Sequence, residues 1–127
     1  MHEALNAYRV RNGLSELLYS DSLETAADAH ARDMYQRDFF SHENPDGETP
    51  LDRAVAAGFC QPMLVGENIA WGQGALTTVP EVQTGWENSP DHNANMLESD
   101  YAFAGMGHYV SPASGRYWVQ VFGTPQY

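Results

Sequence analysis

Tyr117-Trp118-Val119-Gln120-Val121-Phe122 is the stretch of this chain that most clearly predicts a β-strand, and it decides the fold class. Its apolar residues occupy both faces of the strand, because successive side chains of a strand point to opposite sides. Trp118 and Phe122 share one face, and Val119 and Val121 share the other. A strand that is apolar on both faces lies inside a sheet that two layers cover.

A second strand is predicted within residues 101–110, joined to the first by a hairpin turn at Gly115. Glu67-Asn68-Ile69-Ala70-Trp71 predicts an edge strand, bounded by Gly66 and Gly72.

Helices occupy the earlier part of the sequence. Apolar residues recur at 3.6-residue spacing over 22–37, which predicts a helix with Ser22 as its N-cap. Another helix is predicted from about residue 5 to Gly13, a residue that often terminates helices.

Three shorter helices complete the pattern. Thr49, Pro50 and Asp52 predict the start of a helix that ends near Ala57, with Thr49 as N-cap. Further helices are predicted from Val79 and over 90–97. Helices precede strands without β-α-β alternation, so we expect an α+β class with a mainly antiparallel sheet. The 127 residues suffice for one domain, 1–127.

Composition excludes several function classes. Seventeen acidic residues against six basic ones give a net charge of −11, which would repel nucleic acid. No apolar run approaches the roughly 20 residues that span a bilayer, so no integral membrane segment is expected. Cys60 is the only cysteine, and we expect it to be a small buried apolar residue.

His42, His92 and Glu67 are the candidate site residues. Both histidines lie among Ser, Pro, Asn and Asp residues, in segments that commonly face a cleft. Glu67 precedes an apolar strand, where a carboxylate is costly to bury unless it meets a cation, a metal or several donors. By contrast, we expect His30 and His108 to have structural roles in a helix and a strand.

Five segments, in this order, resemble the CAP superfamily, which includes cysteine-rich secretory proteins, antigen 5 and plant pathogenesis-related proteins. They are Phe40-Ser41-His42 with Asn44-Pro45-Asp46-Gly47, Gly66-Glu67-Asn68-Ile69-Ala70, Trp86-Glu87-Asn88-Ser89-Pro90-Asp91-His92-Asn93-Ala94-Asn95-Met96-Leu97, Gly105-Met106-Gly107 and Tyr117-Trp118-Val119-Gln120-Val121-Phe122-Gly123. The resemblance extends from Leu5 to Gly123 and is strongest to short bacterial members.

The resemblance implies a three-layer α-β-α sandwich and a cleft lined by two histidines and two acids. It assigns the first histidine to His42, the first acid to Glu67 and the second histidine to His92. Ser89 stands where eukaryotic members carry the second acid. An alternative alignment would take His108 as the second histidine, but the glycine pair Gly105 and Gly107 favours His92.

The resemblance also implies an extracellular or cell-surface protein, with a secretion signal that is not part of this sequence. We expect a monomer whose cleft binds a divalent metal such as zinc, a small apolar or cell-envelope ligand, or both. His42 and His92 would be metal ligands, and Glu67 a ligand or an orienting group.

Two alternatives remain. One is a metal-dependent hydrolase, protease- or esterase-like, that uses His42, Glu67 and His92 as catalytic residues. Here Ser89 is interpreted as an N-cap before Pro90 rather than a nucleophile. The other is a purely structural His/Glu network. Binding is favoured over catalysis.

Overall fold

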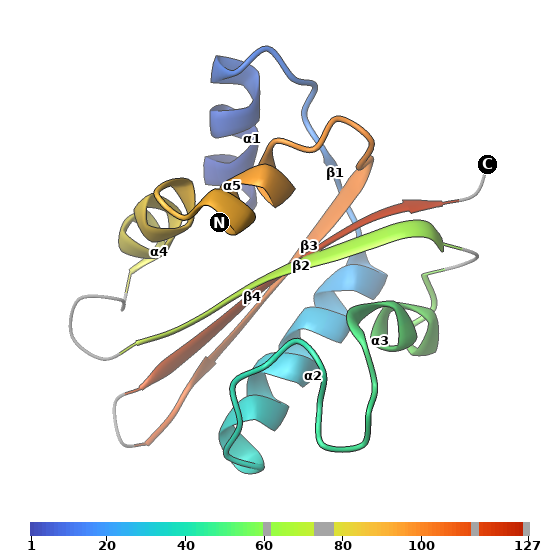
Figure 1. Cartoon of the computed structure of the whole chain (residues 1–127), viewed down its shortest axis with the longest axis vertical. Coiled ribbons are helices and arrows are strands. Elements are labelled where there is room, and N and C mark those ends of the chain that lie inside the picture. Colours follow the sequence, from blue (N-terminus) through green and yellow to red (C-terminus); the bar gives the residue numbers. More distant parts are fainter. Residues whose placement is uncertain (60–61, 73–77, 113–114, 126–127) are drawn as a thin grey trace.

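The computed structural model describes residues 1–59, 62–72, 78–112 and 115–125. The elements of this part are α1 (His2–Arg11), β1 (Leu18–Tyr19), α2 (Asp21–Gln36), α3 (Pro50–Ala56), β2 (Pro62–Gly72), α4 (Val79–Glu87), α5 (Pro90–Met96), β3 (Phe103–Val110) and β4 (Arg116–Pro125). A sheet separates α1, α4 and α5 on one side from α2 and α3 on the other (Figure 1). The expected α+β class and α-β-α sandwich are confirmed.

The sheet has the strand order β1-β3-β4-β2. β4 pairs antiparallel with both β3 and β2, and the short β1 pairs parallel with β3. The interior position predicted for residues 117–122 is therefore confirmed. Trp118 and Phe122 pack in the core beneath α1, α4 and α5, whereas Val119 and Val121 pack beneath α2 and α3.

Helix α2 lies directly on β3, and two glycines make this contact possible. A Cβ added to Gly105 would lie 2.2 Å from the backbone nitrogen of Glu24, and one added to Gly107 would lie 2.2 Å from the carbonyl carbon of Ala27. Because backbone atoms cannot rotate away as side chains can, these distances admit only glycine. The small buried face of α2, which includes Ala27 and Ala31, completes the close approach.

Two predicted helix starts had different outcomes. At α3, the Thr49 side chain accepts from the Asp52 backbone N–H and the Asp52 carboxylate accepts from the Thr49 N–H, so the predicted capping box is confirmed. At α2, the predicted cap was wrong: Ser20, not Ser22, accepts from Leu23 N–H at 3.2 Å. β1 ends just before Ser20 and leaves it extended, so Ser22 already lies in the first helical turn.

The strands also differ from the sequence pattern at two places. β2 extends over 11 residues instead of the five predicted, because its first half pairs with the distant end of β4. β1 was not predicted at all, because a strand of two residues is too short to show a repeating pattern of apolar and polar side chains. Cys60 and part of the predicted hairpin turn lie outside the described residues.

A buried arginine fastens the first helix to the last. Arg9 is 1% exposed and donates to the carbonyl oxygens of Ser15, Met96 and Glu98, each at 2.9 Å. The bonds to Met96 and Glu98 satisfy carbonyls at and just after the end of α5, where no further helical turn can pair with them. Within the residues that the structure describes, no helix is long and apolar enough to cross a membrane.

The contact between α2 and β3 generates a stability prediction. Gly107→Ala should destabilise the domain by about 3 kcal/mol, because its Cβ forces α2 away from the sheet. Gly13→Ala is the matched control: Gly13 has φ +79° but no atom within 4 Å of an added Cβ, so we expect a loss of about 1 kcal/mol. Urea unfolding of the three proteins measures both changes. A Gly107→Ala protein as stable as the parent would show that the contact is not tight.

Candidate functional site

Glu67 lies at the centre of the candidate site. Its side chain leaves β2 toward the layer of α2 and α3, and the residue is only 5% exposed. Oε2 accepts from Nη2 of Arg53 at 2.9 Å, and Oε1 lies 2.9 Å from Nδ1 of His42. Both carboxylate oxygens therefore have charged or polar partners, as burial of a carboxylate requires.

Arg53 supplies the positive charge in this network. It lies in the middle of α3 with its guanidinium buried, and it also donates to the carbonyl oxygens of Glu48 at 3.0 Å and His42 at 2.7 Å. Arg53 thus fixes the loop between α2 and α3 at two points. The sequence reasoning missed this residue, although the expectation that Glu67 needs a cation pointed to one of only six arginines.

His30 borders the network from α2. It is completely buried, and its Nε2 lies 2.8 Å from the carbonyl oxygen of Ser41 and 3.9 Å from Oε1 of Glu67. Burial lowers the pKa of His30, against a smaller opposing effect of the Glu67 charge. The expected structural role of His30 agrees with these contacts.

His42 is the exposed member of the network. Its Nδ1 is fixed by Glu67, yet its side chain is 53% exposed. The adjacent Ser41 does not form a pair with this imidazole, since the Ser41 hydroxyl accepts from the Glu43 N–H instead. A half-exposed imidazole that a carboxylate holds at one ring nitrogen is oriented in a way that suits ligand binding.

His92 lies on α5, in the opposite helical layer. Its Nδ1 is 2.7 Å from Oγ of Ser89, and its ring stacks on Trp86 at 6.3 Å between centroids. Burial, and to a smaller extent the charge of His42, lowers the pKa of His92, while the charge of Asp91 and the nearby Ile69 carbonyl have opposing effects. Burial therefore favours the neutral form of this ring.

Ser89 has a different role from the one predicted. It is the N-cap residue of α5 by position, but its side chain makes no capping hydrogen bond. The hydroxyl bonds to the His92 ring instead. Ser89 and His92 thus form a polar pair at the start of α5.

Edge strand β2 brings the two layers together. Alternate residues face opposite layers, so Glu67 meets α2 and α3 while Asn68 faces α5 and donates to the His92 carbonyl at 3.1 Å. The backbone carbonyls of Glu67 and Ile69 accept from Asn95 and Trp86, each at 3.2 Å. The α2–α3 loop and α5 thereby approach the same strand edge from opposite sides.

An apolar cavity of about 240 Å³ adjoins this edge. Its walls combine the loop before His42 with β2, α4 and α5, and they include Phe40, Ile69, Trp71, Val82, Trp86, Ser89 and His92. The cavity links the region of His42 with that of His92, because Phe40 lies two residues before the first and the second forms part of the wall.

His108, the alternative second histidine, lies elsewhere. It belongs to β3, which β4 separates from β2, and its ring stacks on Trp118 at 4.0 Å between centroids. It makes none of the contacts described for Glu67. The alignment that assigns His92 is thus consistent with the geometry.

Two bacterial proteins show clear sequence similarity to this chain. YkwD of Bacillus subtilis (strain 168) is 36% identical over 120 residues, which cover 94% of this chain and 44% of YkwD. The B. subtilis protein YlbC, described as a membrane protein, is 31% identical over 117 residues, which cover 92% of this chain and 31% of YlbC. The chain thus spans less than half the length of either relative.

Solved structures share the fold over nearly the whole chain. An outer surface protein from Borrelia burgdorferi superposes with a TM-score of 0.89 at 22% identity, over 98% of this chain and 90% of that protein. An extracellular protein containing a SCP domain from Bacillus anthracis gives a TM-score of 0.85 at 28% identity, over 97% and 39%. The sequence model of the CAP family, described as the cysteine-rich secretory protein family, matches residues 2–122. This chain belongs to the CAP family.

Proposed function

We propose that this domain is a binding module whose cleft at the edge of β2 takes a divalent cation between His42 and His92 and an apolar ligand group in the adjoining cavity. One observation carries the proposal: a buried carboxylate fixes the exposed imidazole of His42 at 2.9 Å. A carboxylate that holds an exposed imidazole in one orientation prepares that ring to bind a ligand.

In this proposal two imidazoles are the donors to the cation. Glu67 is an orienting group rather than a ligand in this proposal, because Arg53 and His42 already occupy its two oxygens. Among the residues that the structure describes, no group of three or more His, Cys, Asp or Glu side chains could hold a metal. Two protein ligands leave the remaining positions to water, so we expect modest affinity.

The cavity indicates the second part of the ligand. Aromatic and aliphatic side chains, including Phe40, Trp71 and Val82, dominate its walls, and its volume of about 240 Å³ suits a small apolar group. A small apolar molecule or a cell-envelope component would fit this combination of apolar walls and nearby imidazoles.

An extracellular or cell-surface location agrees with the names of the neighbours. One is an outer surface protein and another an extracellular protein, while YlbC is described as a membrane protein. We therefore propose that the domain works at the outer face of a cell envelope.

Zinc titration tests the cation site. Zinc at 100 times its Kd should stabilise the domain by about 2.7 kcal/mol, because it binds the folded cleft only. His42→Ala and His92→Ala should each remove most of this gain, and Glu67→Gln should reduce it less. The melting temperature, measured with and without zinc at pH 7.5, provides the readout. Below about pH 6 the gain should fade as imidazoles become protonated.

His108→Ala is the matched control for that titration. It removes an imidazole outside the cleft and should keep the full zinc response. If zinc leaves the melting temperature of the parent protein unchanged, the cation site is refuted and the His/Glu cluster is a structural network. A response that survives in both His42→Ala and His92→Ala would place the metal elsewhere.

Ester or amide hydrolysis is a second candidate, favoured by the 2.7 Å contact between Ser89 Oγ and His92 Nδ1. In this reaction Oγ attacks the substrate carbonyl while His92 accepts its proton. The tetrahedral intermediate then expels the alcohol or amine, which takes the proton back, and water hydrolyses the acyl-enzyme by the same route. This version uses the serine rather than the metal-bound water expected for a metal-dependent hydrolase.

A p-nitrophenyl ester of a short fatty acid tests the second candidate. Turnover should survive chelation by EDTA, and Ser89→Ala and His92→Ala should each lower kcat/KM at least about 100-fold. Ser41→Ala is the matched control and should retain full turnover. Turnover that EDTA abolishes would favour metal-bound water, and turnover equal in Ser89→Ala would exclude the serine.

A further inference from the structure

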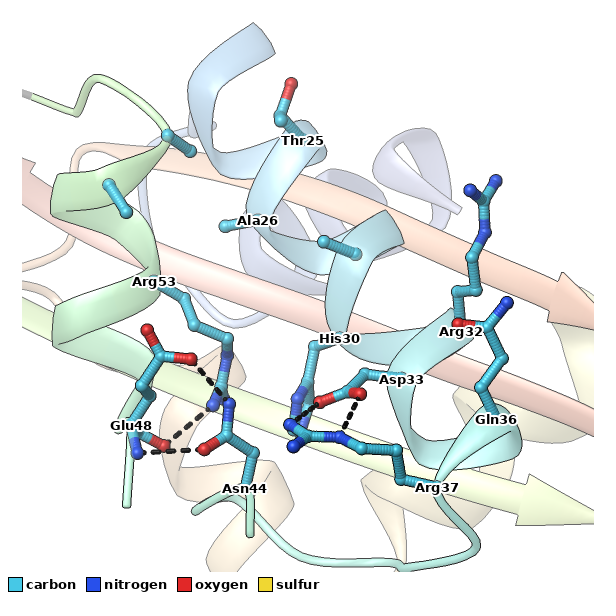
Figure 2. Close-up of a pocket in the computed structure, with 13 residues that line it drawn as sticks. Thr25, Ala26, His30, Arg32, Asp33, Gln36, Arg37, Asn44, Glu48 and Arg53 are labelled. Atoms are coloured by element: carbon cyan, nitrogen blue, oxygen red, sulfur yellow. Dashed lines mark hydrogen bonds and ion pairs between the residues drawn. The ribbon is translucent and has the colours of Figure 1, made fainter. Parts of the chain in front are cut away.

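A second cavity, of about 510 Å³, lies between α2 and α3 (Figure 2). The loop that carries Asn44 and Glu48 forms one of its ends. It shares no lining residue with the cavity beside His92, and its volume lies in the range of small-molecule sites. The two cavities are therefore distinct, although His30 and Arg53 of the Glu67 network also line this one.

His30 gives the wall of this cavity an unused hydrogen-bond acceptor. Its Nε2 contacts the Ser41 carbonyl at 2.8 Å, and because a carbonyl only accepts, Nε2 carries the ring proton. Nδ1 of the neutral ring is then an acceptor, and it is buried without a hydrogen-bond partner in the described part of the chain. An unpaired buried acceptor is costly, so we expect a donor from outside the chain.

Charges of both signs gather at the loop end. Arg37 extends from α2 and Glu48 from the loop opposite, and both residues are exposed. Three of the chain's six arginines line the cavity together with two acids, and one of these arginines, Arg53, is already paired with Glu67. Arg37 forms a bidentate pair with Asp33 and a single contact with the more exposed Asp46, so a ligand carboxylate would compete with Asp46 for the Nη1 group.

Alanines make part of the cavity wall apolar. Alanine methyl groups line it from both sides: Ala26 and Ala29 on α2, Ala56 at the end of α3 and Ala57 just after it. Methyl groups on both walls leave room for small aliphatic groups. They provide neither a surface for an aromatic ring to stack on nor a hydrogen-bond partner for a strongly polar group. The ligand must therefore join a short apolar part to a dipolar part.

We propose that this cavity binds a short zwitterionic peptide with small side chains. Its carboxylate lies toward Arg37, its ammonium group toward Glu48, and its peptide N–H supplies the donor that His30 Nδ1 lacks. The small side chains pack on the alanines. Asp33 and Glu48 would repel a purely anionic ligand. An alkyl chain would leave His30 Nδ1 without a hydrogen-bond donor.

The probe is L-alanyl-L-alanine, added to the uniformly ¹⁵N-labelled protein. We expect saturable shifts of the amides around Ala29 and Ala57, and an upfield shift of the His30 Nδ1 resonance as it accepts a hydrogen bond. Arg37→Gln should weaken binding about 10-fold. It should also abolish the preference for this dipeptide over its C-terminal amide.

Ala29→Phe fills the groove from an exposed helical position and should abolish binding, while Ala7→Phe, at an exposed position of α1, should not. Both variants should keep the zinc response, so failure of the peptide site and failure of the cation site are distinguishable. The proposal is overturned if the dipeptide causes no saturable shift at millimolar concentration, if Ala29→Phe binds it equally, or if the His30 Nδ1 resonance does not move.

Discussion

The carboxylate of Glu67 is the group on which the site and the loop between α2 and α3 depend. An isolated carboxylate at 5% exposure would cost several kcal/mol, so the chain must bring partners to it. α3 brings Arg53, the loop brings His42, and α2 closes the space with His30. Because Arg53 also binds two loop carbonyls, the charge balance of one buried group determines the path of the loop.

The alternation of β2 explains why a site forms at its edge. Successive side chains of an edge strand reach into both helical layers, so Glu67 organises one layer and Asn68 the other. An interior strand such as β4 has a neighbouring strand on each side, and these strands keep the two helical layers apart. The edge is where His42 and His92, carried by different layers, can serve a common cleft.

The features predicted best from the sequence are those that residues close together in the chain determine. The two apolar faces of residues 117–122, the apolar stripe of α2 and the capping box at Thr49 all depend on residues close in the chain. The full length of β2 depends on pairing with the distant strand β4, and no local pattern contains that information.

The same distinction applies to the site. Glu67 was identified because a carboxylate before an apolar strand is costly wherever it is buried. Its partner Arg53 could be expected as a cation but not named, since only the packing of α3 decides which arginine reaches it. For Ser89 the predicted backbone position was correct but the predicted contact was not. Ser89 is the N-cap residue of α5, yet its hydroxyl bonds to the His92 ring instead of capping the helix.

The hydrogen bonds along the outer edge of β2 have a consequence for the behaviour of the protein at high concentration. Unpaired strand edges invite strands of other molecules and so lead to domain swapping and aggregation. Asn95 and Trp86 occupy the edge carbonyls of Glu67 and Ile69, while Pro62 lacks an N–H to offer at the strand's start. The helices beside β2 therefore also protect this edge of the sheet from pairing with a strand of another molecule.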